Sequence, residues 1–129
     1  MNPIGVTTWL WTSPLSDADL DRLVQIFGRD STYVEIQNAG LSEQHEINPQ
    51  LIALAKETGL PLVATGDVHY LDAEDAFAHE ALLCIQSGDS LKNEGRWKFD
   101  TDQFYFKTPA EMAADFADYP QALRTSVEI

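Results

Sequence analysis

Apolar positions recur along the chain at two different spacings. In residues 16–28 they fall three and four positions apart, which predicts an amphipathic helix that begins at Ser16 and ends at Gly28. A second helix is expected up to Thr58, with Asn48-Pro49 either capping or restarting it. A third is expected between Asp72 and Gly88. The apolar positions of the three helices are Leu20, Leu23, Val24 and Phe27; Leu51, Ile52, Leu54 and Ala55; and Phe77, Ala81, Leu82 and Ile85.

Two short stretches have the composition of strands. Residues 32–37 are β-branched and aromatic, which places Val34 and Ile36 on one face and Tyr33 and Glu35 on the other. Residues 62–65 form a short apolar run, typical of a strand covered on both faces. Helices and strands alternate, and this order predicts parallel strands in an α/β layer.

The remaining segments have a different character. Residues 1–15 have no clear period and are interpreted as an irregular leader, and residues 88–102 are polar and loop-like. A brief strand is predicted at 103–106. A helix capped by Thr108 should follow and run to about Ala117. Another helix starts at Asp118 and continues to the end of the sequence.

The charge balance restricts the partners of the chain. Among 129 residues, 21 are acidic and 8 are basic, for a formal charge of −13. Such a surface repels the DNA backbone, and it fits an acidic metal site or a basic protein partner better. Cys84 is the only cysteine, so no intrachain disulfide can form, as expected in a reducing cytoplasm. No stretch resembles a signal peptide or a membrane span.

Two side chains with metal-binding chemistry follow the second predicted strand. Asp67 and His69 are separated by one residue, so in extended chain both point to the same side. A carboxylate and a neutral imidazole form half of a site for Zn, Mn or Fe, and a bound metal could activate water for attack on phosphorus. The alternative is that Asp67 caps a turn and His69 is a partly exposed loop residue.

A metal site needs three or four protein ligands. Glu35, near the end of the first predicted strand, is the best third candidate, and the alternative for it is a half-buried acid bonded to backbone. His45 and His79 fall in predicted helices, where solvated positions are expected. The interleaved basic and aromatic residues of 92–107 could stack on single-stranded nucleic acid, or they could be core anchors with a solvated rim.

Four blocks resemble one known family. They read "IFGRDSTYVEIQNAGLSEQ", "GLPLVATGDVHYLDAEDAFAHEALLCIQSGDSL", "FDTDQFYFKTPAEM" and "FADYPQALRTSVEI". Together they resemble the bacterial replicative DNA polymerase III alpha subunit over about residues 20–129. The resemblance is to the end of its PHP (polymerase and histidinol phosphatase) domain, here 16–87, and to the connector towards the polymerase palm, here 88–129.

The resemblance implies a fold and a site. It implies the C-terminal strands and helices of a distorted (β/α)7 barrel, followed by a mostly helical connector. Asp67 and His69 match the last metal-binding motif of the family, whereas Glu35 is not carried over as a ligand. Family members with all their ligands resemble phosphoesterases and can support 3′–5′ exonuclease proofreading. In other members the domain is structural or binds a separate proofreading subunit.

The chain departs from the family pattern, because the His-x-His pair that opens a PHP domain is absent. It is therefore interpreted as part of a polymerase subunit that is inactive alone, binds Zn or Mn weakly or not at all, and exposes strand edges through which copies could associate. Its expected partners are the rest of the polymerase chain, a proofreading exonuclease subunit, and DNA only through the parent protein. The alternatives are a standalone metal-dependent phosphoesterase and a non-catalytic acidic protein-binding module.

Overall fold

The computed structural model describes residues 17–129, so the predicted leader 1–15 and the predicted cap Ser16 lie outside the described residues. In chain order the elements are α1 (Asp17–Phe27), η1 (Arg29–Ser31), β1 (Val34–Gln37), α2 (Ser42–Thr58), β2 (Leu62–Thr65), η2 (Ala73–Asp75), α3 (Ala76–Ser87), α4 (Pro109–Asp115) and α5 (Pro120–Glu128). The three predicted helices and the two predicted strands between 17 and 88 are all present.

The two strands pair in parallel, as the alternation of helices and strands predicts. The register joins Val34 to Leu62 and Gln37 to Thr65, and α2 makes the connection between the strands. Within the described residues the sheet has these two strands and is open, so the fold is mixed α/β with five α-helices. A partial barrel agrees with this arrangement and remains a prediction.

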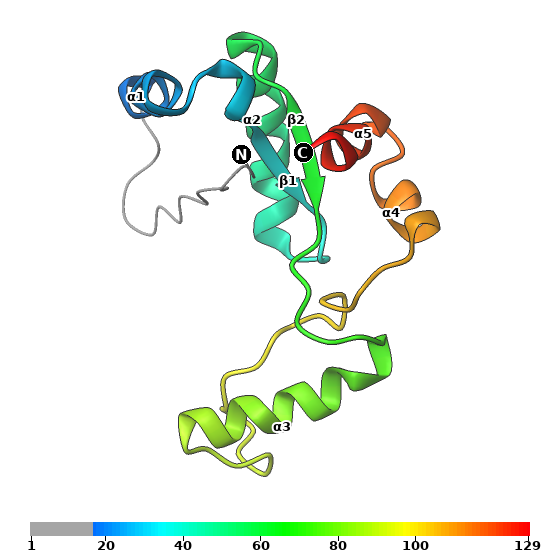
Figure 1. Cartoon of the computed structure of the whole chain (residues 1–129). Coiled ribbons are helices and arrows are strands. Elements are labelled where there is room, and N and C mark those ends of the chain that lie inside the picture. The colour runs from blue at the N-terminus through cyan, green and yellow to red at the C-terminus, as the bar shows by residue number, and fades with distance from the viewer. Residues whose placement is uncertain (1–16) are drawn as a thin grey trace.

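One face of the sheet carries the main core. Ile36 and Ala64 lie next to each other on that face, each 1% exposed, and Ala122 of α5 is fully buried against them. Ile52 of α2 and Phe116 complete the cluster. In Figure 1, α2 lies behind the two strands and α5 lies beside β2. A second cluster joins Leu20, Val34, Ala55 and Leu60 around α1. We call α1, β1, α2, β2, α4 and α5 together the α/β body.

The second helix does not restart at Asn48-Pro49. Pro49 lies inside α2, where it cannot donate a backbone hydrogen bond. The Asn48 amide donates to the Gln37 carbonyl at 2.8 Å, so this turn of the helix is held against the end of β1. Gly59, with φ of 67°, ends the helix in the left-handed conformation as expected.

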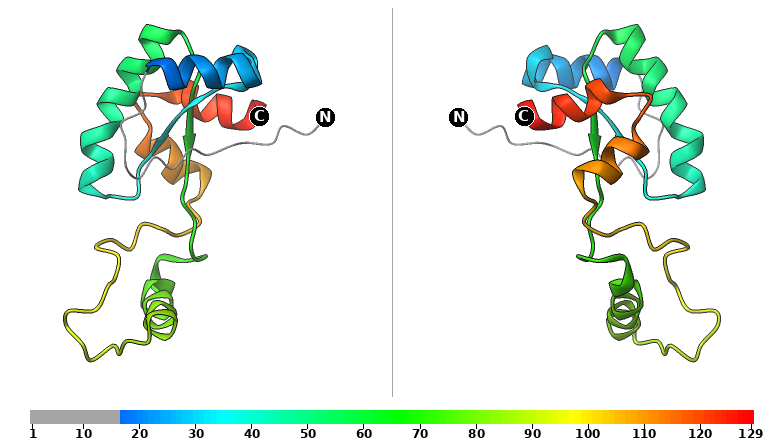
Figure 2. Two further views of the ribbon diagram at one scale, coloured as in Figure 1. Left: turned by 90° about the vertical axis from the view of Figure 1, so that its left-hand side faces the viewer. Right: turned by 90° about the vertical axis from the view of Figure 1, so that its right-hand side faces the viewer.

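Residues 66–106 leave the body and return to it, and we call this segment the α3 lobe. Figures 1 and 2 show α3 and the loop after it apart from the sheet, joined to the body by two chain segments that run close together. Asp72 and Asp75 form a capping box that starts η2, and Gly88 ends α3 with φ of 70°. Three of the four apolar positions predicted on α3 are exposed, namely Phe77, Leu82 and Ile85.

The strand predicted at 103–106 is reduced to one parallel bridge, between Tyr70 and Tyr105. The apolar residues of 103–106 do not mark a longer strand; among them, Phe104 is buried, at 2% exposed.

The helix capped by Thr108 ends at Asp115, two residues earlier than expected. α5 packs on β2, although the sequence assigns it to the connector, and the division at 87/88 remains a prediction. No helix among residues 17–129 is both long enough and apolar enough to cross a membrane.

Candidate metal-ligand pair at the carboxyl end of the sheet

Asp67 and His69 face each other just beyond the carboxyl end of β2. Nε2 of His69 lies 3.2 Å from Oδ1 of Asp67, and the two side chains are 32% and 37% exposed. The spacing therefore places them on the same side of the chain, as expected. The pair is partly open to solvent, which a ligand pair needs, and its role in binding metal remains a prediction.

The backbone and aromatic neighbours of His69 fix its position. Its N–H donates to the Phe104 carbonyl at 2.8 Å. Its ring meets the rings of His79, Phe99 and Phe104 edge-on, with centroids 5.1–5.3 Å apart. A loop imidazole held in this way loses little conformational entropy when it binds a ligand.

The solvated position predicted for His79 is wrong. The imidazole is half-buried and stacks on Phe99, with centroids 5.6 Å apart and planes 12° apart. Burial and the neighbouring His69 both lower the pKa of His79 below its ordinary value. His45, by contrast, is exposed on α2, as expected.

Glu35 belongs to a separate network on the face of the sheet opposite to Ile36. Its Oε1 accepts a hydrogen bond from the Thr65 hydroxyl and another from the Gln37 amide at 3.4 Å. The half-buried interpretation of Glu35 is therefore the better one, with side chains as partners in place of backbone. Across residues 17–129, no three His, Cys, Asp or Glu side chains gather closely enough to hold a metal ion.

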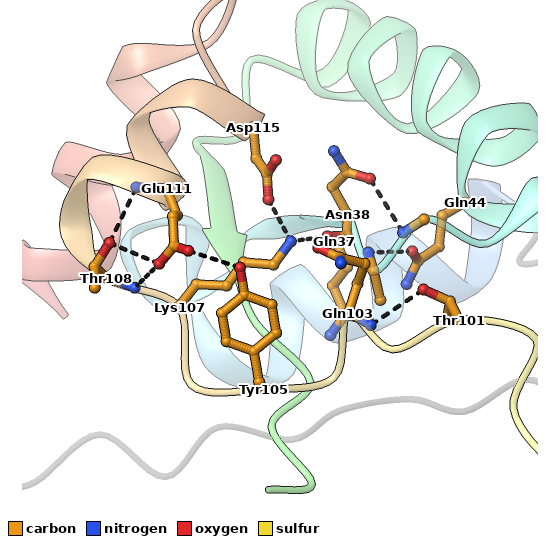
Figure 3. Close-up of polar contacts among 12 residues, drawn as sticks. Gln37, Asn38, Gln44, Thr101, Gln103, Tyr105, Lys107, Thr108, Glu111 and Asp115 are labelled. Atoms are coloured by element: carbon orange, nitrogen blue, oxygen red, sulfur yellow. Dashed lines mark hydrogen bonds and ion pairs between the residues drawn. The ribbon is translucent and has the colours of Figure 1, made fainter. Parts of the chain in front are cut away.

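A small pocket of about 220 Å³ lies beside Asp67. Lys107, at its wall, has a side chain only 8% exposed; its ammonium donates to the Asn38 carbonyl at 3.0 Å and pairs with Asp115 (Figure 3). The sequence indicated Lys107 only as a member of a basic and aromatic set. Its actual role is to join the segment before α4 to the loop after β1, an arrangement that no local pattern signals.

Local hydrogen bonds stabilise the chain on both sides of Lys107. Thr108 and Glu111 form the predicted capping box, and the Tyr105 hydroxyl donates to Glu111 at 2.8 Å (Figure 3). The Thr108 hydroxyl and N–H hold the pKa of Glu111 below its usual range. Gly40 has φ of 74°, and a Cβ there would lie 3.3 Å from Oγ1 of Thr101, so a glycine suits this close approach.

Five of the nine basic and aromatic residues of 92–107 are at least partly buried, and the other four, Lys92, Trp97, Lys98 and Phe106, are exposed. Arg96 pairs with Glu80 at 2.5 Å, Lys107 pairs with Asp115, and Phe99 packs on Phe104 with centroids 4.3 Å apart. Arg96, Lys107, Phe99 and Phe104 are therefore not available to contact phosphates or to stack on bases. The core-anchor alternative is the one that these contacts favour.

Known proteins resemble this chain clearly. No protein-family model matches it. DNA polymerase III subunit alpha of Thermus aquaticus is 50% identical over 100 residues, which is 78% of this chain and 8% of the relative. The subunit of Treponema pallidum is 42% identical over 104 residues, 81% of this chain and 9% of the relative. That of Deinococcus radiodurans is 49% identical over 88 residues, 68% of this chain and 6% of the relative.

The chain therefore belongs to the DNA polymerase III subunit alpha family, as the quoted blocks suggested. It spans less than a tenth of the length of the curated relatives it matches. A match of 100 residues in a chain of 129 has to include positions 30–100, so the similarity to the Thermus aquaticus protein extends through Glu35, Asp67, His69 and α3.

Proposed function

We propose that this chain is a segment of a replicative DNA polymerase III alpha subunit, comprising the last part of its PHP domain and the connector to the polymerase core. The observation that carries the proposal is 50% identity over 78% of the chain to a protein of that name. The parent copies DNA by nucleotidyl transfer in the cytoplasm. The segment supplies part of a metal site and a structural bridge, and alone it is inactive.

In the parent, Asp67 and His69 contribute two ligands to a divalent-metal site for Zn or Mn. The donor set suits this role in part, because a carboxylate and an imidazole face each other at 3.2 Å and remain partly exposed. A complete site needs three or four protein ligands, so the others come from outside the described residues. A metal bound there would supply a Lewis acid for phosphate-ester hydrolysis.

The residues of this segment hold the ligand pair in place. The Phe104 carbonyl accepts from the His69 N–H, and Lys107 joins the segment that carries Phe104 to the loop after β1. Glu35 is engaged with Thr65 and Gln37, which supports a positioning role for it and not ligation. With two ligands and no third, the isolated chain should bind metal weakly.

The charge of the segment indicates how its partners are arranged. A formal charge of −13 disfavours direct contact with DNA, so DNA is reached through basic parts of the parent. The rest of the polymerase polypeptide is the principal partner, and a proofreading exonuclease subunit is another. The outer edges of β1 and β2 are unpaired among the described strands, so isolated copies should tend to associate.

Sequencing the DNA on both sides of the 129 codons is the most direct test. A continuous reading frame with a His-x-His pair upstream and catalytic aspartates of the palm downstream would support the proposal. A frame closed on both sides by unrelated genes would contradict it.

A biochemical test separates the proposal from a standalone phosphoesterase. Zn and Mn would be titrated into the chain, and hydrolysis of p-nitrophenyl phosphate and of a 3′-labelled oligonucleotide would be followed. We expect weak binding and no turnover, and Asp67→Ala should behave like Asp118→Ala, a control at an exposed acid. Tight metal binding with hydrolysis, both lost only in Asp67→Ala, would establish the phosphoesterase instead.

A further inference from the structure

α3 presents a continuous apolar stripe to solvent. Phe77, Leu82 and Ile85 are 67%, 62% and 77% exposed, and Ala78 and Ala81 lie between them at helical spacing. We call these five residues the α3 stripe. Singly exposed apolar residues are ordinary, whereas a stripe of this kind marks an interaction surface.

The helix surface outside the stripe is already engaged, so the orientation of the helix is determined within the lobe. Cys84 is 5% exposed, His79 stacks on Phe99, and Glu80 pairs with Arg96. The helix cannot turn its stripe inward without breaking these contacts. The stripe is therefore a fixed feature of the surface.

The whole α3 lobe has the composition of half an interface. Its buried apolar residues are Cys84 and Phe104. Its exposed large apolar residues are Val68, Leu71, Phe77, Leu82, Ile85, Leu91, Trp97 and Phe106. A segment with eight exposed large apolar residues and one buried large apolar residue, Phe104, cannot offset its conformational entropy from its own core, so it needs a surface to pack against.

The charges around the stripe restrict what can cover it. Asp72, Glu74 and Asp75 are exposed at the start of α3, and Asp89 is exposed just after its end. Hydrogen bonds from the Asn93 amide and the Ser90 N–H lower the pKa of Asp89, so it stays ionised at neutral pH. A second copy of α3 would bring like charges together, whereas a groove with an apolar floor and basic edges would complement them.

We propose that the α3 stripe docks into an apolar, basic-rimmed groove elsewhere in the same polymerase polypeptide, an inference that rests on the proposed function. The matched relatives are far longer than this segment, since the aligned 100 residues are 8% of the Thermus aquaticus protein, and the similarity to that protein runs through α3. A covering surface within the same polypeptide is present at high effective concentration, so no separate partner is required.

The test compares the 129-residue chain with the intact subunit by hydrogen–deuterium exchange. We expect the α3 amides to exchange about tenfold more slowly or better in the intact subunit than in the short chain. Leu82→Asp and Ile85→Asp should abolish that protection. Ser87→Asp is the matched control, because it adds the same charge to an exposed position of the same helix on the side away from Leu82 and Ile85. Leu82→Gln serves if the charged variants do not fold.

Three results would overturn the inference. One is equal exchange of the α3 amides in the two proteins. Another is protection in the intact subunit that both Asp variants leave unchanged. The third is a dimer of the short chain that Leu82→Asp dissociates, which would assign the stripe to a second copy. Failure of the proposed function is seen separately, because it appears in the flanking reading frame before any exchange experiment.

Discussion

The α/β body and the α3 lobe are built from similar sequence patterns and differ in what covers them. In the body, Ile36, Ala64 and Ala122 are each at most 1% exposed. They are buried because α5, from the end of the sequence, packs into the same apolar cluster as α2 and the two strands. In the lobe, the stripe of α3 is exposed. Helical periodicity therefore shows that a helix has an apolar face, and the tertiary contacts decide whether that face is a core or an interface.

The two regions also differ in how they are held. The body depends on apolar burial, whereas the lobe is joined to it by hydrogen bonds and one ion pair. Within the lobe, the Phe106 N–H donates to the Tyr70 carbonyl at 3.0 Å and so ties its outgoing segment to its returning one. Lys107, the first residue after the lobe, bonds to the Asn38 carbonyl and pairs with Asp115 of the body. The body should then unfold cooperatively, and the lobe should open locally at lower free energy.

The largest expected effect on the free energy of unfolding comes from truncating one apolar side chain to alanine in each region and comparing the two losses. Ile36→Ala should lower the free energy of unfolding by about 2–5 kcal/mol, because it leaves a cavity under α2 and α5. Leu82→Ala, at a side chain 62% exposed, should change it by at most about 0.5 kcal/mol. Urea denaturation followed by circular dichroism measures both. Similar losses for the two variants would show that the lobe is packed as tightly as the body.

The next largest loss of stability is expected for a substitution at Lys107, where the chain returns from the lobe to the body. Lys107→Met keeps the length of the side chain but removes its bonds to the Asn38 carbonyl and to Asp115, and we expect a loss of about 1–3 kcal/mol. Lys92→Met, at an exposed lysine of the lobe, is the control and should have little effect. If both variants unfold at the same urea concentration, Lys107 does not join the regions energetically.

Features that depend on local chemistry are predicted well from the sequence. The second strand has the predicted bounds, Leu62–Thr65, and the left-handed glycines Gly28, Gly59 and Gly88 end the three predicted helices. The contact between Asp67 and His69 follows from their spacing alone. Each of these features is decided by residues a few positions apart, so a pattern in one window contains the necessary information.

Features that depend on distant contacts are not predicted. Lys107 meets Asn38 across 69 positions, and His79 leaves solvent because Phe99 folds back on it. Pro49 is tolerated within α2, where Asn48 is bonded to β1. No periodicity signals such pairs, because they form only between segments that the tertiary fold brings together.

A smaller effect tests the start of α4. Thr108→Ala removes the hydroxyl that accepts from the Glu111 N–H, and it should cost about 0.5–2 kcal/mol. Thr108→Ser keeps the hydroxyl and should recover most of the loss. The cap lies beside Lys107, so the same urea experiment shows whether fraying of α4 loosens the junction. Equal losses for the Ala and Ser variants would exclude capping as the cause.

The smallest effect concerns pH and reports on the lobe alone. The pKa of His79 is lowered in the folded state by burial and by the nearby His69, from an ordinary value of 6.5. Below about pH 6.5 the unfolded chain therefore binds the proton more readily, so the stability that His79 contributes above this pH is lost as the pH falls towards its folded pKa.

The slope of stability against pH is the readout that isolates this titration. His79→Gln should flatten the slope below pH 6.5, whereas His45→Gln, at an exposed site, should leave it unchanged. Loss of the ring contact with Phe99 would shift the whole curve and not its slope, so packing and protonation can be distinguished. An NMR midpoint for His79 at or above 6.5 would mean that the lobe is open in solution and that the stack on Phe99 does not persist.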